Sequence, residues 1–193
     1  MLEIHLVRHG ETEENLHRVL QGRMPGRLTQ RGISQAETLR DELAASGIHF
    51  DAMVCSPLER AQATARIINT RLGLPFRTDQ DLAERDWGSI TGIQLEQGKK
   101  VDIPADAETD RQMYARASRV LNHLFSLYPD ACVLVVAHGL FNRALLAVSQ
   151  GCTIHDVRPM QNAEVRLIRM QNLLGIDDDG CHQQEGGDVV SAN

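Results

Sequence analysis

Short apolar runs with few polar interruptions are the feature of this sequence that most constrains its fold. They cover residues 4–7, 52–55 and 132–137, and the last of them reads Cys-Val-Leu-Val-Val-Ala. Runs of this length without regular polar alternation are typical of strands that are buried on both faces of a parallel sheet. A weaker run at residues 165–168 predicts a further strand late in the chain. The sequence therefore predicts a mainly parallel central sheet.

Helical patterns lie between these runs. Apolar residues recur every three or four positions within residues 30–46, 58–72, 110–128 and 140–148, and Thr29 is a candidate N-cap for the first of these segments. The alternation of strands and helices predicts an α/β protein, a three-layer α/β/α sandwich. We expect residues 1–175 to form a single domain with a short polar excursion at about residues 93–109. Residues 176–193 read as an acidic, disordered tail.

The charge of the chain is concentrated in that tail. The chain has 26 acidic and 20 basic residues; five of the acids and none of the bases lie in residues 176–193, which leaves 21 acids and 20 bases in residues 1–175. A nearly neutral body argues against nonspecific nucleic-acid binding, which requires a basic face. All the bases except Lys99 and Lys100 are arginines, whose planar guanidinium matches phosphate and carboxylate oxygens.

Other features lead us to expect a cytoplasmic protein. The sequence has no run of ~20 apolar residues that could span a membrane, and its first residues are too acidic for a signal peptide. Its cysteines do not form a CxxC pair or a zinc-like spacing, so we expect reduced, largely buried thiols and no metal. They are Cys55, Cys132, Cys152 and Cys181.

Residues with chemical potential follow three of the predicted strands. Arg8 and His9 follow the first run, Arg60 comes shortly after the second, and His138 follows the third. Because ligands bind beyond the carboxyl ends of parallel strands, we expect these side chains to meet at one edge of the sheet. Glu84, in a loop-like segment, adds a carboxylate.

Such a set of side chains can transfer a phosphoryl group. Arginines neutralise the phosphoryl oxygens, and a neutral imidazole with a pKa near 6.5 can attack phosphorus. A carboxyl group can protonate the leaving oxygen and then activate water, so this chemistry requires no metal or cofactor. Ser56 also follows a strand, but Ser-Pro lacks the G-x-S-x-G elbow of serine hydrolases.

The local sequence resembles a known family. Leu6-Val7-Arg8-His9-Gly10-Glu11-Thr12 is similar to the signature of the histidine phosphatase superfamily, also called the phosphoglycerate mutase-like family. The likeness extends over roughly residues 1 to 170, through Leu20-Gln21-Gly22, Leu28-Thr29-Gln30-Arg31-Gly32, Ser56-Pro57-Leu58-Glu59-Arg60-Ala61-Gln62, Glu84-Arg85-Asp86-Trp87-Gly88, Ala137-His138-Gly139 and Gln161-Asn162-Ala163.

The resemblance implies a fold and a role for each matching residue. The fold is a parallel-sheet sandwich with a late antiparallel strand, for which residues 165–168 are the candidate. His9 is expected to become phosphohistidine, Glu84 to be the proton donor and later the base, and Arg8, Arg60 and His138 to form the phosphate clamp. Residues expected to bind phosphate or substrate are Arg8, Thr12, Asn15, Gln21, Gly22, Arg60, Glu84 and Gly139.

Two outcomes of this chemistry compete. The run at residues 84–92 resembles the mutase version, but the following excursion is short and has Gln94-Leu95-Glu96-Gln97 where a substrate-gripping lysine is expected. Residues 104–109, leading into a helix with Arg116, resemble the phosphatase branch, although its paired glycines are absent. We favour a metal-independent phosphomonoesterase acting on a small phosphorylated metabolite. The alternatives are a phosphoglycerate mutase and a noncatalytic phosphate-binding adaptor. We expect no nucleic-acid or membrane partner, and the sequence leaves a homodimer open.

Overall fold

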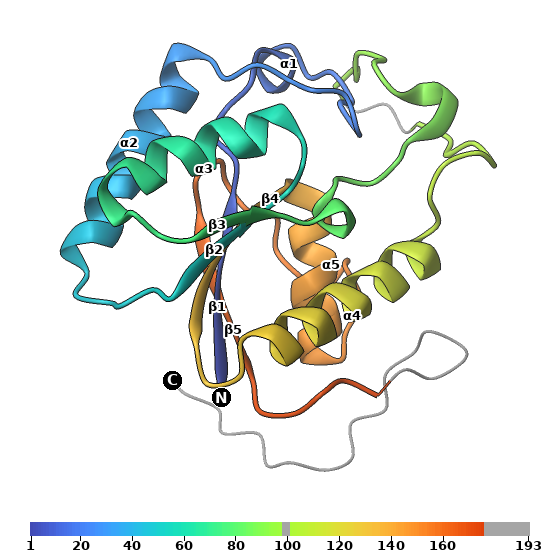
Figure 1. Cartoon of the computed structure of the whole chain (residues 1–193). Coiled ribbons are helices and arrows are strands. Elements are labelled where there is room, and N and C mark those ends of the chain that lie inside the picture. The colour runs from blue at the N-terminus through green and yellow to red at the C-terminus, as the bar shows by residue number, and fades with distance from the viewer. Residues whose placement is uncertain (98–100, 176–193) are drawn as a thin grey trace.

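A five-stranded sheet forms the centre of the protein. The computed structural model describes residues 1–97 and 101–175 (Figure 1). The strands are β1 (Leu2–Arg8), β2 (Ala52–Cys55), β3 (Phe76–Thr78), β4 (Cys132–Ala137) and β5 (Val165–Met170), in the order β3-β2-β4-β1-β5. β1, β2, β3 and β4 run parallel, and β5 pairs antiparallel with β1. The predicted sheet and its late antiparallel strand are confirmed.

Helices cover both faces of the sheet. α2 (Gln30–Ala45) and α3 (Glu59–Leu72) lie on one face, and α4 (Asp110–Leu127) and α5 (Gly139–Gln150) lie on the other (Figure 1). α1 (Glu13–Leu16) and the 3₁₀ turns η1 (Gln80–Leu82) and η2 (Gly88–Ile90) are short connections. The predicted three-layer α/β/α sandwich is confirmed.

Each face of the sheet has its own apolar core. Leu6 and Val135 pack with α4 and α5, whereas Val7 and Val136 pack with α2 and α3. Successive strand residues point to opposite faces, so a strand buried on both sides must be apolar at every position. This explains the apolar runs of β2 and β4.

The helices begin and end at identifiable signals. Thr29 caps α2 by accepting a hydrogen bond from the Gly32 N–H, as its position in the sequence predicted. Gly73 and Gly151 end α3 and α5 in the left-handed conformation, at φ 61° and 66°. The four predicted helices agree with the structure to within a few residues at each end.

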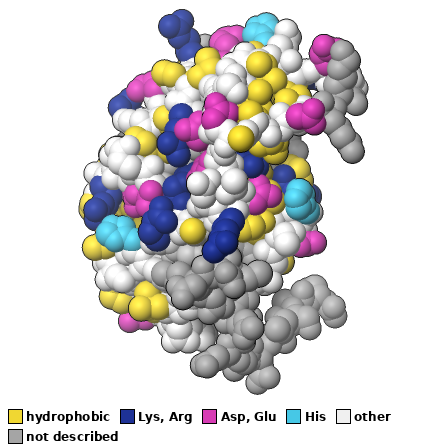
Figure 2. Space-filling model, turned by 90° about the vertical axis from the view of Figure 1, so that its right-hand side faces the viewer, with side chains coloured by type: hydrophobic (Ala, Val, Ile, Leu, Met, Phe, Trp, Pro, Cys, Tyr) yellow, Lys and Arg dark blue, Asp and Glu magenta, His cyan; other side chains and the backbone are white. Residues whose placement is uncertain are grey.

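The surface carries mixed charge on the face that Figure 2 shows, where basic and acidic side chains are interspersed and apolar side chains form small groups. No helix within residues 1–97 and 101–175 is long and apolar enough to cross a bilayer. Lys99, Lys100 and the predicted acidic tail at residues 176–193 lie outside the described residues.

Candidate active site

The carboxyl ends of three parallel strands bring the predicted residues together. His9 follows β1, Ser56 follows β2, and His138 follows β4, which lies between β1 and β2 in the sheet. The ring centroids of His9 and His138 are 5.3 Å apart, with the rings at 60°. The sequence-based expectation that these strand ends share one edge is met.

His9 has one ring nitrogen fixed by the backbone and one directed toward the arginines. Its Nδ1 lies 2.7 Å from the Gly10 carbonyl oxygen, which can only accept, so Nδ1 carries the hydrogen. The Nε2 atom then holds the lone pair, and Arg60 Nε donates a hydrogen bond to it over 3.2 Å. The ring is 3% exposed. Nε2 is therefore the nucleophilic atom of this imidazole.

The surroundings of His9 keep its ring neutral. Burial lowers the pKa of His9 well below 6.5, and the positive charges of Arg60 and Arg8 lower it further, against the opposing hydrogen bond to Gly10. This differs from the ordinary imidazole pKa near 6.5 that the sequence alone led us to expect. The lowered pKa preserves the Nε2 lone pair into mildly acidic conditions.

Two arginines are held by backbone carbonyl groups. Arg60 is 1% exposed and donates from Nη2 to the Gly22 carbonyl at 2.7 Å, and from Nη1 to the Met24 carbonyl. Burial lowers the pKa of Arg60 to about 10. Arg8 donates from Nη1 to the Met160 carbonyl at 2.6 Å, and its buried Nε has no partner.

His138 is positioned by a serine. Its Nε2 lies 2.6 Å from Ser56 Oγ, which also accepts the Leu58 N–H at 3.2 Å. The Ser56 hydroxyl can therefore donate to Nε2, so a neutral His138 ring carries its hydrogen on Nδ1. This Nδ1 atom is buried and has no partner. Burial, followed by the charge of Arg60, lowers the pKa of His138 well below 6.5. The Nδ1–H of His138 is therefore an uncharged donor.

Glu84 is held at the start of α5. Its Oε1 accepts the N–H groups of Phe141 and Arg85, both at 2.9 Å, and its Oε2 accepts the Leu140 N–H at 3.2 Å. The first N–H groups of a helix have no partner within the helix, so a carboxylate is a natural acceptor for them. The resulting arrangement fixes both carboxylate oxygens.

Glycine is required where the turn after β1 meets α2. A Cβ atom on Gly10 would lie 2.4 Å from the Gly32 carbonyl oxygen, which no real Cβ contact allows. The same turn holds the Gly10 carbonyl that binds His9 Nδ1, and the Gly10 N–H donates to Thr64 Oγ1 at 3.0 Å.

A cavity of about 240 Å³ opens onto these groups. Eight of the predicted catalytic and binding residues line it, namely Arg8, His9, Asn15, Gln21, Gly22, Arg60, Glu84 and Gly139. Trp87 also lines it. Its other walls are Val19, Leu20, Leu140, Arg143, Pro159 and Met160.

Two predicted residues lie behind this lining. His138 is fully buried and packs against His9. Thr12 is also fully buried, and its hydroxyl caps α1 by accepting the Asn15 N–H, so the structure assigns it a local structural contact. Asn15 Oδ1 accepts from Thr12 N and from Asn162 Nδ2, and Asn162 Nδ2 also donates to the His9 carbonyl.

Sequence reasoning missed several residues of the site. Arg143 lies one helical turn after Gly139, a spacing that could have indicated it. Pro159 and Met160 carry no chemically reactive side chain that the sequence could single out. Met160 binds Arg8 through its backbone carbonyl. Ser56 was considered as a nucleophile, but the structure pairs it with His138 instead.

Three residues of metal-ligating types cluster away from this site. Among the described residues, Glu3, His5 and Cys132 have donor atoms within 4.8 Å of one another, near the starts of β1 and β4. The Arg169 Nε donates to Glu3 at 2.8 Å and so already supplies a cation there. His9 and His138 lie beyond the opposite ends of the same strands.

Unpartnered polar atoms at and behind the cavity wall suit a phosphoryl group. Four buried side-chain polar atoms in the described part of the chain lack a partner: the donors Arg8 Nε and His138 Nδ1 and the acceptors Gln21 Oε1 and Asn142 Oδ1. Buried donors are expected to bind an acceptor, and an anionic oxygen is a strong one. The two donors form a site for an anion. The Nε2 lone pair of His9 supplies a nucleophile, and the Glu84 carboxyl group can carry a proton.

Comparisons with known proteins agree with this arrangement. The model of the histidine phosphatase superfamily (branch 1) matches residues 4–174. The chain is 37% identical over 154 residues to the uncharacterized phosphatase PhoE of Bacillus subtilis, covering 78% of this chain and 79% of that protein. It is 32% identical to a 2,3-bisphosphoglycerate-dependent phosphoglycerate mutase of Methylobacterium, with 79% and 82% covered. Among solved structures, a putative alpha-ribazole-5'-P phosphatase from Escherichia coli superposes with a TM-score of 0.76 at 26% identity, covering 93% of each chain.

Proposed function

Because the chain belongs to the histidine phosphatase superfamily, as its motifs predicted, we propose that it is a metal-independent phosphomonoesterase that acts through a phosphohistidine at His9. Its substrate in this proposal is a small phosphorylated metabolite. The observation that carries the proposal is the state of the His9 ring: Nδ1 is fixed by the Gly10 carbonyl, and Nε2 keeps its lone pair beside the cavity.

In the first step, His9 Nε2 attacks phosphorus and the ester P–O bond breaks. The leaving oxygen takes a proton from the Glu84 carboxyl group, while Arg8, Arg60 and the His138 Nδ1–H offset the charge on the phosphoryl oxygens. In the second step, the Glu84 carboxylate accepts a proton from water as the water oxygen attacks phosphorus and the N–P bond breaks. Phosphate leaves, and Glu84 is again protonated.

The walls of the cavity support hydrolysis over mutase chemistry. The cations that line it within the described residues are Arg8, Arg60 and Arg143. Arg8 and Arg60 form the clamp, and Arg143 donates to the carbonyls of Val157 (2.9 Å) and Ile154. Much of the remaining wall is apolar, with Val19, Leu20, Trp87, Leu140 and Met160. A mutase must also grip a second anionic group of its substrate, whereas a phosphatase needs one phosphate clamp.

Phosphoglycerate mutase is the second candidate, because several relatives at 32–34% identity carry that name. In it, the phosphoryl group passes from His9 to a second hydroxyl of a retained substrate rather than to water. The two activities share every residue of the first step.

One assay series distinguishes the candidates. The protein is incubated with 4-nitrophenyl phosphate, with and without chelator, and separately with 3-phosphoglycerate, and free phosphate and 2-phosphoglycerate are measured. Chelator-resistant phosphate release that is lost in His9→Ala supports the phosphatase. Formation of 2-phosphoglycerate faster than phosphate release would establish the mutase instead, and no turnover of any ester, with phosphate binding retained, would indicate the adaptor.

A further inference from the structure

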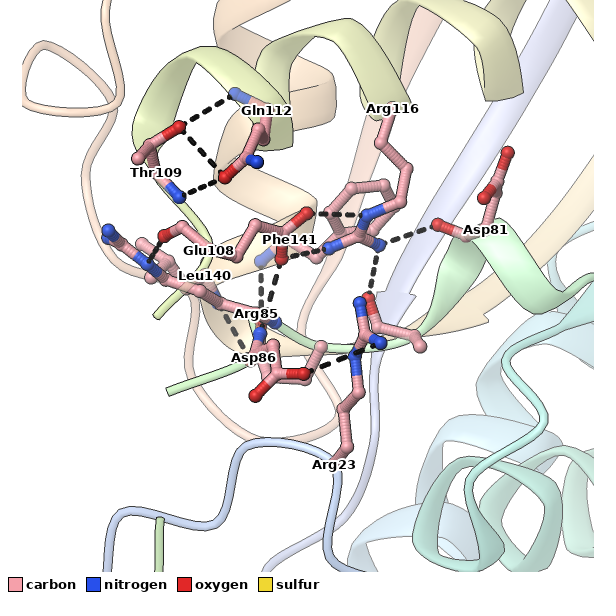
Figure 3. A network of polar contacts seen from close by, with 12 residues as sticks. Arg23, Asp81, Arg85, Asp86, Glu108, Thr109, Gln112, Arg116, Leu140 and Phe141 are labelled. Atoms are coloured by element: carbon pink, nitrogen blue, oxygen red, sulfur yellow. Dashed lines mark hydrogen bonds and ion pairs between the residues drawn. The ribbon is translucent and has the colours of Figure 1, made fainter. Parts of the chain in front are cut away.

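Arg116 of α4 is a buried cation that the steps above do not use. It is 5% exposed, and its guanidinium donates in two directions (Figure 3). Nε and Nη2 donate to the two carboxylate oxygens of Glu108 at 2.8 and 2.7 Å, and Nη1 donates to the carbonyls of Asp81 and Ala83 at 2.7 and 2.6 Å. Neither Arg116 nor Glu108 is among the described residues that line the cavity; both line a separate surface groove.

These contacts fix the chain on the amino-terminal side of Glu84. The Ala83 carbonyl belongs to the peptide bond that joins Ala83 to Glu84, so the hydrogen bond from Arg116 sets the plane of that peptide. The second acceptor, the Asp81 carbonyl, lies in the turn η1 that leads to this segment.

Glu108 fixes the carboxyl-terminal side of the same segment. Its Oε2 accepts the Asp86 N–H at 3.2 Å, and its backbone N–H donates to the Asp86 carbonyl at 2.8 Å. Its own carbonyl accepts from Arg85 Nε at 2.8 Å. Glu84 thus lies between two anchored stretches of chain. The Arg116–Glu108 ion pair, which Figure 3 shows, joins the two anchors.

Arg116 also contacts the helix that holds the Glu84 carboxylate. Its guanidinium carbon lies 3.9 Å from the centroid of the Phe141 ring, and the Phe141 N–H donates to Glu84 Oε1. One side chain therefore touches both the backbone that carries Glu84 and the residue that binds its carboxylate.

We propose that the Arg116–Glu108 pair is a positioning unit for Glu84, and that it determines how well the enzyme cleaves esters with strongly basic leaving groups. The proposal rests on the proposed function, in which Glu84 protonates the leaving oxygen. A proton donor matters most when the leaving alkoxide is a strong base, and least for a weakly basic 4-nitrophenolate. In the first step, a displaced Glu84 therefore slows the cleavage of alkyl phosphates selectively, since a small misplacement of a reacting group can cost a large factor in rate.

The test compares an alkyl phosphate, glycerol 1-phosphate, with 4-nitrophenyl phosphate in four variants. Glu84→Gln defines the signature of a lost proton donor: we expect a fall in kcat/KM of about 100-fold or more for the alkyl ester and a much smaller fall for the aryl ester. The ratio kcat/KM is compared because it reports the steps up to loss of the leaving group, before Glu84 activates water for both esters alike. Arg116→Lys keeps the charge but lacks the planar fork, and we expect an alkyl-selective fall of ~10-fold in kcat/KM. Glu108→Gln is expected to show the same selectivity more weakly. It tests the proposal independently if Arg116→Lys does not fold.

The matched control is Arg119→Lys, on the same helix and one turn further along. Arg119 is exposed and pairs with the Asp81 side chain at 3.4 Å rather than with the backbone beside Glu84. We expect both its rates to stay within about twofold of the unaltered chain. This inference alone would be overturned if Glu84→Gln shows the selective loss but Arg116→Lys and Glu108→Gln lose kcat/KM equally on both esters. Equal losses on both esters in Glu84→Gln would overturn the proposed role of Glu84, and this inference with it. No turnover of either ester by the unaltered chain would overturn the proposed function.

Discussion

The Nε atom of Arg60 donates a hydrogen bond to the Nε2 atom of His9 over 3.2 Å, although the two residues are 51 positions apart in the sequence. The same lone pair cannot accept this hydrogen bond and attack phosphorus. In the proposed first step Arg60 must therefore transfer its donor from His9 to a phosphoryl oxygen as the N–P bond forms. The Arg60 N–H that holds the nucleophile before the reaction thus becomes part of the phosphate clamp.

Replacing His9 should abolish turnover and the covalent intermediate. We expect His9→Ala to lower kcat by at least about 1,000-fold, because no other group supplies the Nε2 lone pair. In the unaltered chain, mass spectrometry after a quench that avoids acid should find the phosphoryl group on the peptide that contains His9. His155→Ala, an exposed histidine, is the control and should keep its activity. A phosphoryl group on a different residue would contradict the mechanism.

Arg60 should control the titration of His9. Because burial and the charge of Arg60 lower the pKa of His9, its ring should remain neutral at pH 6.5, and Arg60→Met should move its titration midpoint to higher pH. NMR titration of the labelled imidazole rings measures both midpoints without relying on the catalytic rate. A midpoint near 6.5 in the unaltered chain, or no change in Arg60→Met, would contradict this account of the ring.

The two buried histidines should make stability depend on pH. Both pKa values are lowered in the folded state, so below about pH 6.5 the unfolded chain binds protons that the folded chain does not. Stability from these groups is complete above that pH and falls as the pH decreases toward the lowered pKa values, by up to about 1.4 kcal/mol per pH unit for each histidine. Urea denaturation at pH 7.5 and pH 5.5 should show a smaller loss in His9→Gln/His138→Gln than in the unaltered chain. Equal losses would show that neither ring is held neutral.

The elements whose burial leaves a pattern in the sequence were predictable. The apolar run at residues 132–137 predicted β4 because every one of its positions packs in a core or at its margin, and the helices followed from their apolar stripes. β3 was missed because Phe76, Arg77 and Thr78 are all exposed and their strand conformation depends on pairing with β2. A short edge strand without buried residues has no apolar periodicity to detect.

The candidate site was predictable to the same extent and for a related reason. Residues that follow parallel strands meet at one edge, so His9, Arg60 and His138 could be grouped before any geometry was known. Contacts made by the backbone could not be predicted, as the Met160 carbonyl that binds Arg8 shows. The hydrogen bond from Arg116 to the Ala83 carbonyl could not be predicted either, since it depends on how α4 packs beside the Glu84 segment.

Ser56 should control which nitrogen of His138 carries the hydrogen. We expect Ser56→Ala to lower kcat by ~10-fold, because Nε2 loses its partner and the Nδ1–H donor toward the phosphoryl group is no longer favoured. Nitrogen chemical shifts of the His138 ring should show the change of tautomer directly. The control is Ser34→Ala, whose hydroxyl donates to the Gln30 carbonyl on the exposed side of α2. An unchanged tautomer in Ser56→Ala would contradict the assignment.

The close contact between Gly10 and Gly32 should make a single methyl group costly. In Gly10→Ala the new Cβ would lie 2.4 Å from the Gly32 carbonyl oxygen and 3.0 Å from its carbon, both backbone atoms that a side-chain rotation cannot relieve. We expect a loss of about 2–3 kcal/mol in the free energy of unfolding, measured by urea denaturation. The turn that holds Gly10 must then move, and it carries the carbonyl that fixes His9 Nδ1, so kcat should fall as well. Gly175→Ala is the control, since its Cβ would have no neighbour within 4 Å, and its stability should stay within about 0.5 kcal/mol of the unaltered chain. Equal stabilities of the two variants would mean that α2 can move away from the turn, and that this contact does not set the position of the nucleophile.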